Sequence, residues 1–474
     1  LEPIVLLTAD RPVELIGSGA NQTTVQHGIF GPHAATVDFP IARRRGGQNA
    51  LWRGLLCRVL ADREAAPLHI NIPFAEPLVP ESDAGWPEPL QGRDDGAPWT
   101  VITSAVRAPT QGIELLRALP ARTLVLVGEA PWHPAAAAGE VARAMDWPLL
   151  VEPPGVGPRH ALSSASLIVN SVEELPEQLR PDAIVVVGRP TLSRGVNRLL
   201  RSGIPVHLVC TPAHWADAQY VASSAVVSMD PAALEQLSMA EREQRSDPGF
   251  SAGWRKANER IAAVIAEWLA AAPWPTGAGV AAEMLRALPA PAVLFFGSSN
   301  AIRDADLVAE RRGDLTVLAN RGLAGIDGAI STALGATMAV SAVRGRPIPG
   351  FALLGDLSFL HDAGALLRGP DEPGGDLTVV VNNDNGGGIF ALLEQGEAQY
   401  GADFERIFGT PQDVDIAALC AGYRVRHTLV GSPESLRRAI ESRGGIHVVE
   451  VRTDRAALRA QRAELHAAVI RALR

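Results

Sequence analysis

Short apolar runs alternate with amphipathic stretches along most of the chain. The runs are rich in Val, Ile and Leu, and they include IVLLTADRP, RTLVLVGEAP, DAIVVVGRP, FALLGD and LTVVVNN. Continuous apolar runs of this kind are typical of parallel strands that helices cover on both faces. Between them the apolar positions take a helical period, as in Lys256–Ala271, where they recur at i, i+3, i+4, i+7 and i+8. The alternation predicts an α/β protein with parallel sheets.

Two polar stretches divide the chain into three segments. Residues 75–100 are rich in Pro, Gly and acidic residues without any period, and residues 231–252 turn polar again. Both stretches have the composition of linkers. A length of 474 residues agrees with this division, since domains of about 150 residues would give about three. We therefore predict three domains with doubly wound parallel sheets, over residues 1–80, 81–250 and 251–474.

The first segment opens almost at once with its strand, at Ile4–Leu7. A buried parallel strand usually lies deep in a domain and not at a free end. We therefore expect the first domain to be truncated, with part of it preceding this chain.

Composition and charge narrow the classes of function. The chain is 47% hydrophobic and 20% charged, as is ordinary for a globular protein with a substantial core. A net charge of −9 and a pI near 5.7 argue against nucleic acids or anionic membranes as partners. Cys57, Cys210 and Cys420 are too scattered for a disulfide framework or a cysteine zinc site. Because no apolar run reaches the roughly 20 residues of a membrane span, we expect a cytoplasmic protein without membrane insertion.

Polar side chains stand at the ends of two consecutive predicted strands. Gly355 and Asp356 end FALLGD, and Asn382 and Asn383 end LTVVVNN. In a parallel sheet both carboxyl ends lie at the same edge, where ligands of open α/β sheets bind. A carboxylate, an amide oxygen and a nearby backbone carbonyl form an oxygen-only site, which suits Mg²⁺.

Glycines follow the second of these strands. Residues 386–388 are all glycine and precede IFALLEQ, which we predict to be a helix. Glycine-rich backbone at a helix N-terminus can bind a diphosphate. Taken alone, each of these pieces is more typical of an ordinary turn. Their combination predicts a ligand that carries magnesium and diphosphate.

The spacing resembles the signature of thiamine diphosphate (ThDP) enzymes. Asn383 follows Asp356 by 27 positions. In that family the aspartate, the second asparagine and a carbonyl two residues later hold Mg²⁺ (or Mn²⁺), which implies Asp356, Asn383 and the carbonyl of Asn385. The chain departs from the pattern in two places. Leu357 stands where glycine is usual, and NNDNGGG has an apparent extra residue, so that Gly386 is the alternative source of the carbonyl.

A narrower resemblance covers nearly the whole chain. GDLSF, NNDNGGGIF, SNAIR, ANRGLAGIDG and TADRPVELIGSGANQ together resemble the 2-succinyl-5-enolpyruvyl-6-hydroxy-3-cyclohexene-1-carboxylate (SEPHCHC) synthase (MenD) family. This implies a ThDP-enzyme fold with the remnant of a pyrimidine-binding domain (1–80), a central domain (81–250) and a diphosphate-binding domain (251–474). It also implies a homodimer or homotetramer whose active sites lie between subunits.

The resemblance implies a transferase of menaquinone biosynthesis. Such an enzyme decarboxylates 2-oxoglutarate and adds the succinyl carbanion to isochorismate in a 1,4 sense. The resemblance also implies that Ile326, in GIDG, props the thiazolium ring of the cofactor against its aminopyrimidine. The cofactor-binding residues that it implies are Gly355, Asp356, Leu357, Ser358, Asn383, Asn385, Gly386, Gly388, Ile389 and Phe390, together with Ile326.

Arginines follow three of the predicted strands. Both expected substrates are dianions, and arginine binds carboxylates in a bidentate fork. Arg303 and Arg321 follow strands of the third segment, and Arg11 follows the first strand of the chain. A single arginine is most often a surface residue, but three at strand ends favour a function. The resemblance implies substrate contacts for all three, and also for Ser299, Asn21 and Gln22.

One catalytic residue expected from the family has no match in the chain. Most ThDP enzymes activate the cofactor with a glutamate, which in this family precedes the strand IVLLTADRP. We therefore expect about 100 residues of the pyrimidine-binding domain, on ordinary domain size, to be absent. A protein that began at Leu1 should be inactive.

Two other functions remain open on the sequence. A different ThDP-dependent decarboxylase or carboligase, of the acetolactate-synthase type, would turn over pyruvate or bind flavin. A catalytically silent α/β protein that senses a metabolite would bind a nucleotide without Mg²⁺ and ThDP. Fold alone does not distinguish these functions.

Overall fold

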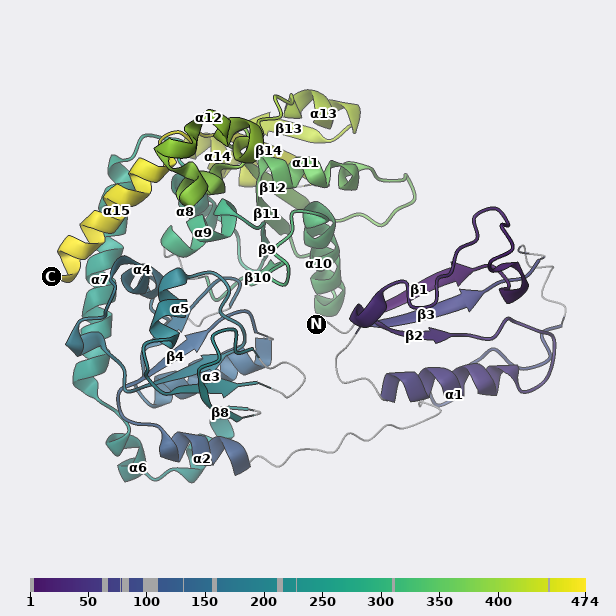
Figure 1. Cartoon of the computed structure of the whole chain (residues 1–474), viewed down its shortest axis with the longest axis horizontal. Helices are drawn as coiled ribbons and strands as arrows, with labels where there is room; N and C mark the ends of the chain where they lie inside the picture. Colours follow the sequence, from purple (N-terminus) through teal and green to yellow (C-terminus); the bar gives the residue numbers. More distant parts are fainter. Residues whose placement is uncertain are drawn as a thin grey trace. The chain divides into compact units, whose positions relative to one another are not determined.

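The computed structural model describes residues 4–61, 67–76, 78, 85–96, 110–130, 132–155, 160–210, 216–226, 228–308, 312–441 and 444–474. The chain divides into two compact units, one over residues 1–108 with 212–214 and the other over 109–211 and 215–474 (Figure 1). None of the described helices is both long enough and apolar enough to cross a membrane.

The first unit is a small parallel sheet with one long helix. Its strand order is β1-β3-β2, so β3 is central and pairs on both sides. The central strand is largely buried, whereas β1 lies at an edge and exposes Val5 and Leu7. The strand predicted at 4–7 is confirmed, and HINIPF and residues 50–61 form a strand and a helix. The elements are β1 (Val5–Asp10), β2 (Ala35–Asp38), α1 (Gln48–Ala61) and β3 (Leu68–Pro73), with 3-10 turns η1 (Val13–Leu15) and η2 (Gly31–His33).

The second unit begins with a five-stranded parallel sheet. Its order is β5-β4-β6-β7-β8. The apolar runs RTLVLVGEAP and DAIVVVGRP supply two of its three central strands, as predicted, and IPVHLVC supplies the third. The elements are α2 (Thr110–Ala118), β4 (Thr123–Val127), α3 (Trp132–Ala144), β5 (Leu149–Val151), α4 (Ala165–Ser171), η3 (Glu177–Leu179), β6 (Ala183–Val187), α5 (Arg194–Leu200), β7 (Val206–Val209) and β8 (Ala222–Val226).

A six-stranded parallel sheet follows, with the order β10-β9-β11-β12-β14-β13. Its strands are β9 (Val293–Phe296), β10 (Thr316–Ala319), β11 (Gly350–Gly355), β12 (Leu377–Asn383), β13 (Arg426–Leu429) and β14 (Ile446–Arg452). Its main helices are α8 (Gly277–Ala287), α9 (Asn300–Val308), α10 (Ala329–Arg344), α11 (Asp356–His361), α13 (Ile416–Gly422), α14 (Pro433–Glu441) and α15 (Leu458–Leu473).

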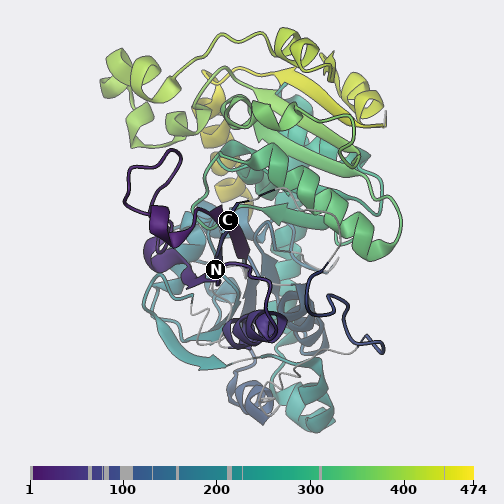
Figure 2. The ribbon, with the colours of Figure 1, turned by 90° about the vertical axis from the view of Figure 1, so that its right-hand side faces the viewer.

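Helices cover both faces of the six-stranded sheet, which confirms the predicted doubly wound architecture. Phe295 and Leu354 pack with α10, α11 and α13 in one core, while their neighbours Phe296 and Leu353 pack with α8, α9 and α14 in another. Successive residues of a strand point to opposite faces, so each apolar run serves two cores. In Figure 2 the helices of this region lie in front of and behind the green strands.

One core is shared by the two sheets of the second unit. It extends from Leu124 and Ile184 of the five-stranded sheet to Phe296 and Leu353 of the six-stranded sheet. Helix α7 (Pro248–Ala271) joins them and packs against α4 and α15, as Figure 1 shows.

The second predicted linker contains regular structure. Residues 231–252 form η5 (Pro231–Gln236), α6 (Met239–Gln244) and the first residues of α7. Helix-capping side chains explain why this polar stretch is helical and not irregular. Asp230 and Asp247 accept backbone N–H bonds in front of η5 and α7, and Ser238 with Glu241 forms a capping box for α6. The polar composition therefore reflects helix starts and not an irregular linker.

The helix predicted for IFALLEQ is also wrong. The segment forms the 3-10 turns η7 (Gly388–Leu392) and η8 (Glu394–Gly396). Arg459 donates to the carbonyl oxygens of Ala391 and Leu393, which in a continuing helix would accept backbone N–H groups. The side chain therefore supports a folded segment that is not an α-helix.

Candidate active site

The carboxyl edge of the six-stranded sheet brings the predicted signature residues together. Strands β11 and β12 pair with Gly355 opposite Asn382, so Asp356 and Asn383 follow side by side. Strand β9 lies on the other side of β11, although β10 and α10 separate them in the chain. The strand order therefore reverses between β9 and β11, and such a switch point is where open α/β sheets bind ligands.

Asp356 is a buried carboxylate at the start of α11, with 3% of its surface exposed. Burial raises its pKa to about 6, while backbone N–H groups of Leu357 and Gly386 that bond to the carboxylate oppose this rise. The bond from Gly386 ties the turn after β12 to the end of β11.

Asn383 has a fixed orientation. Its Nδ2 donates to Glu450 Oε1 (2.9 Å), and its Oδ1 accepts from the backbone N of Asn385 (3.0 Å). Glu450 is fully buried and also pairs with His427 (3.1 Å). Because Glu450 takes the amide nitrogen, the amide oxygen faces the turn at residues 384–386, as a metal ligand would require.

The two candidate carbonyl groups lie in that turn. Asn385 has a φ of 54°, and Gly386 has a φ of 141° that favours glycine. Arg455 Nη1 donates to the carbonyl oxygens of Asp384 (2.8 Å) and Asn385. A cation at the Asn385 carbonyl would therefore replace or share a contact that the guanidinium now makes.

Two residues that the sequence interpretation missed, Asp384 and Asn300, also lie at this edge. Burial, and then the nearby Asp356 carboxylate, raise the pKa of Asp384 to about 7. Asn300 Oδ1 and Asn382 Oδ1 are buried without a hydrogen-bond partner among the described residues. A Cβ at Gly388 would collide with the Asp384 carboxylate and lie 3.4 Å from Asn300 Nδ2. Their sequence signals were the Asn in SNAIR and the Asp in NNDNG, which both lie within motifs already singled out.

This donor set fits a magnesium-bound diphosphate. Asp356 and Asp384 repel each other in a buried setting, which a divalent cation would relieve. Buried polar atoms without partners call for an explanation, and a bound ligand would supply one. The oxygen-only chemistry of Asp356, Asn383 and the 384–386 turn suits Mg²⁺.

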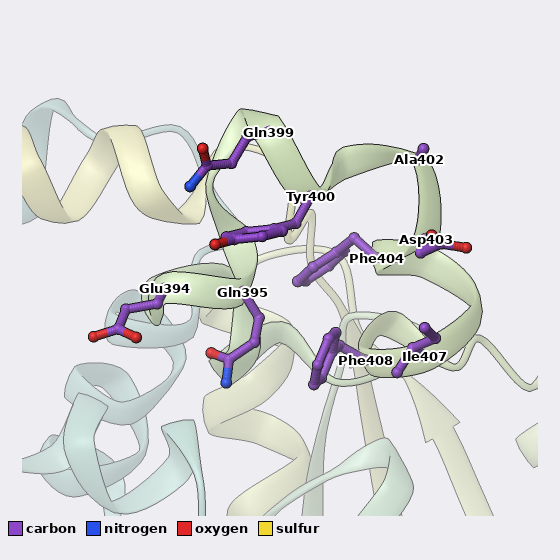
Figure 3. Close-up of a pocket in the computed structure, with 9 residues that line it drawn as sticks. All are labelled: Glu394, Gln395, Gln399, Tyr400, Ala402, Asp403, Phe404, Ile407 and Phe408. Carbon is purple, nitrogen blue, oxygen red and sulfur yellow. The ribbon is translucent and has the colours of Figure 1, made fainter.

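The remaining predicted cofactor residues lie on both sides of this turn. Ser358 is buried in α11, and Leu357 beside it is half-buried. Ile389 and Phe390 lie in η7, where the Phe390 ring is 5.4 Å from that of Phe408. A pocket of about 410 Å³ adjoins η7, but no predicted site residue lines it (Figure 3). Its lining residues are Glu394, Gln395, Gln399, Tyr400, Ala402, Asp403, Phe404, Ile407 and Phe408.

The turn between β9 and α9 carries Ser299, and Arg303 follows in the first turn of α9. Ser299 has a left-handed backbone, with a φ of 71°, and strain of this kind often marks functional sites. Its carbonyl accepts from Arg303 Nη1 (2.8 Å). Ser298 Oγ donates to the carbonyl of Gly325 (3.1 Å), which ties this turn to the loop that contains Ile326. Ile326 is half-buried and belongs to none of the hydrophobic cores.

Arg321 connects the two sheets of the second unit. It is 6% exposed, and its Nε and Nη2 donate to Oγ1 (3.2 Å) and the carbonyl oxygen (3.1 Å) of Thr191, which follows β6. Burial, and then the charges of Arg321 and Arg194, lower the pKa of Arg303. Three guanidinium groups therefore lie within electrostatic range of one another, an arrangement that an anionic ligand would stabilise. Arg194 was missed because it lies in the central segment.

The three remaining predicted residues belong to the first unit. Arg11 follows β1, and its Nη2 donates to Gln22 Oε1 (3.4 Å). Gln22 has a φ of 58°, and the carbonyl of Asn21 accepts from Thr23 Oγ1 (3.3 Å). The turn after β1 thus brings Arg11, Asn21 and Gln22 close to one another.

Known proteins resemble this chain over nearly its whole length. It is 41% identical to the 2-succinyl-5-enolpyruvyl-6-hydroxy-3-cyclohexene-1-carboxylate synthase of Saccharopolyspora erythraea, over 99% of this chain and 82% of the relative. The synthases of Rhodococcus jostii and Nocardia farcinica are each 42% identical, over 98% of this chain and 81% of each relative. No protein-family model matches the chain.

A solved structure supports the fold. The benzoylformate decarboxylase of Polynucleobacter necessarius aligns with a TM-score of 0.60 and 16% identity, over 96% of this chain and 82% of that one. At this identity the likeness concerns the fold alone.

Proposed function

The chain belongs to the SEPHCHC synthase family, and on this premise we propose how its residues serve the family reaction. That reaction decarboxylates 2-oxoglutarate and joins the remaining succinyl group to isochorismate. The proposal rests on one observation: metal-binding oxygen donors and anion-binding arginines lie at the same edge of the six-stranded sheet. Oxygen donors lie at the ends of β11 and β12, and the half-buried Arg303 and the buried Arg321 follow β9 and β10.

The cofactor of this reaction is thiamine diphosphate, which supplies the electron sink for the decarboxylation when it is bound. We propose that Asp356, Asn383 and the carbonyl of Asn385 or Gly386 hold a Mg²⁺ ion on its diphosphate. The Asn383 oxygen already faces the 384–386 turn because Glu450 holds the amide nitrogen. The other proposed cofactor contacts come from Gly355, Leu357, Ser358, Gly388, Ile389, Phe390 and Ile326.

The arginines are proposed to bind and orient the two dianions. Arg303 and Arg321 are buried or half-buried, so their charges are weakly screened by water. Arg194 adds a third cation from the start of α5, and Ser299 presents its polar group from a strained turn. Arg11, Asn21 and Gln22 are proposed to complete the substrate site from the first unit of a second copy, in a homodimer or larger homo-oligomer.

The test is an assay of the purified full-length protein with both substrates. Product should form only when 2-oxoglutarate, isochorismate, ThDP and Mg²⁺ are all present, and pyruvate should not replace 2-oxoglutarate. Efficient turnover of pyruvate would contradict the proposed substrate specificity.

Cofactor binding provides a separate test. Calorimetric titration of the full-length protein with ThDP should show tight binding that requires Mg²⁺ or Mn²⁺. Equal affinity in excess chelator would contradict the metal site.

A further inference from the structure

A buried glutamate in the central sheet holds the turn that contacts Arg321. Glu152 directly follows β5 and has 1% of its surface exposed. Its Oε2 accepts from the backbone N of Thr191 (3.0 Å) and Leu192 (3.1 Å), and its Oε1 accepts from that of Ser193 (2.9 Å). Three successive N–H groups thus converge on one carboxylate, which fixes the conformation of this turn.

The turn links two of the site arginines. Thr191 receives both hydrogen bonds that hold the Arg321 guanidinium. Arg194 follows the turn at once as the first residue of α5, and Ser193 caps that helix through a bond from the backbone N of Val196 (3.0 Å). Any shift of residues 191–193 would therefore move the partner of Arg321 and the starting point of Arg194 together.

The charges around Glu152 belong to the same region. Burial, and then the carboxylate of Asp306 on α9, raise its pKa to about 7, against the three backbone bonds. Burial lowers the pKa of Arg321; the charges of Glu129 and Glu152 oppose this shift, and that of Arg189 adds to it. The carboxylate thus stands between the central sheet and the helix that carries Arg303.

We propose that Glu152 is a positioning residue for the substrate site: by holding the turn at residues 191–193, it sets the geometry of Arg321 and Arg194. This inference rests on the proposed function, because it assigns to the central sheet the task of shaping the dianion site. Glu152 itself does not contact substrate in this proposal, and it acts through Thr191.

The primary test compares Glu152→Gln with Arg321→Ala in the full-length holoenzyme. Glutamine keeps the size of the side chain but replaces one accepting oxygen with a donor, so at least one backbone N–H loses its partner. We expect the KM of the substrate bound by Arg321 to rise about tenfold, with kcat and ThDP affinity changed less than about threefold. The KM that rises should be the one that Arg321→Ala raises most.

A double-mutant cycle separates positioning from a general structural effect. If Glu152 acts through Thr191 on Arg321, Glu152→Gln should add little to KM in the Arg321→Ala background. Thr191→Val, which removes the Oγ1 acceptor but keeps the carbonyl, should raise the same KM without touching Glu152. Additive effects, or an unchanged KM in Glu152→Gln, would overturn the proposal.

Asp217→Asn is the matched control. This carboxylate also accepts two backbone N–H bonds within the central segment, from Val221 and Ala222 (3.0 Å each), and among the described residues it bonds to no site residue. It should leave both KM values unchanged. An equal rise in KM in this variant would show that any loosened turn has the same effect and would contradict a special role of Glu152.

Hydrogen exchange reports on the turn without any turnover. The amides of residues 191–193 should exchange faster in Glu152→Gln than in the wild type, and an unchanged rate would overturn the proposed anchoring. If the wild type forms no product from 2-oxoglutarate and isochorismate, the proposed function fails. The exchange experiment still decides whether Glu152 holds the turn.

Discussion

The two sheets of the second unit share an architecture but differ at their carboxyl edges. In the five-stranded sheet, the turns after β4 and β6 bond to each other through Glu129 and Arg189, with backbone N···O distances of 2.9 and 2.8 Å. A Cβ at Gly128 or Gly188 would collide with the backbone of the opposite turn. In the six-stranded sheet, Gly355 has open space around it, and the next residue is the buried Asp356.

This difference shows how sheets of the same architecture can have a structural role or form a ligand site. In the central sheet the strand-end turns satisfy one another's polar groups, and Glu152 takes three more N–H groups. At the other edge, Asn300 Oδ1 and Asn382 Oδ1 have no hydrogen-bond partner among the described residues. Function therefore follows from which polar groups the turns leave for a ligand, and not from the sheet itself.

The largest expected effect comes from removing the carboxylate at the open edge. Asp356→Ala should lower kcat/KM more than about 100-fold, because even outer-shell partners of a metal contribute about 10–100-fold. Mg²⁺-dependent ThDP binding should be lost in calorimetry. Asp362→Ala is the control. Among the described residues, the Asp362 carboxylate accepts hydrogen bonds only from Ser331, so this variant should change kcat/KM less than about threefold. Similar losses in both variants would count against the metal site.

A pair of glycine substitutions compares the two edges directly. Gly188 has a φ of 73° and faces the Glu129 carbonyl, so Gly188→Ala should destabilise the protein by about 3–4 kcal/mol. Gly355 has a φ of −81° and no atom within 4 Å of an added Cβ, so Gly355→Ala should cost less than about 0.5 kcal/mol. Denaturant unfolding of both variants gives the comparison. Equal costs would mean that the two edges are packed alike.

The pH dependence of stability should reveal Glu152. Because its pKa is raised to about 7, the folded protein binds this proton more tightly than the unfolded chain. Stability should therefore fall as pH rises from about 4.5 to about 7, by roughly 2–3 kcal/mol, and stay level above that. Glu152→Gln has no carboxyl group to titrate at this position. The difference in free energy of unfolding between wild type and this variant should therefore shrink by that amount between pH 5 and pH 8. A difference that does not depend on pH would contradict the assignment.

The smallest effect concerns the ion pair over the closed edge. Arg189 and Glu129 are 46% and 29% exposed in their side chains, and such pairs contribute about 0.5 kcal/mol. Arg189→Ala should therefore change the free energy of unfolding by no more than about 1 kcal/mol. A much larger loss would mean that the side chains, and not the backbone, close this edge.

Much of the fold could be predicted because the central strands are apolar on both faces. RTLVLVGEAP, DAIVVVGRP, FALLGD and LTVVVNN all form the predicted strands. Strands β2, β5, β8 and β13 escaped prediction, and each lies at an edge of its sheet. Segments such as ASSAV and RHTL are half polar, because an edge strand need not be apolar on both faces.

The site could be predicted only where the order of strands in the sequence fixes which residues lie together. Asp356 and Asn383 end neighbouring parallel strands, and parallel strands align their carboxyl ends. No such rule connects Thr191 with Arg321 or Arg303 with Arg194, because packing between two separate sheets decides these contacts. Glu152 was missed for the same reason, since its partners lie in a distant turn.

The shared core has a consequence for synthesis of the protein. Leu124 and Ile184 are made early, but α15, which packs against α4 and α7, is made only when residues 458–473 leave the ribosome. Until then, the apolar surface of α4 and α7 that packs against α15 lacks its final cover. Exposed faces of this kind promote aggregation in large proteins. The nascent chain should therefore depend on chaperones longest at the face that α15 finally covers.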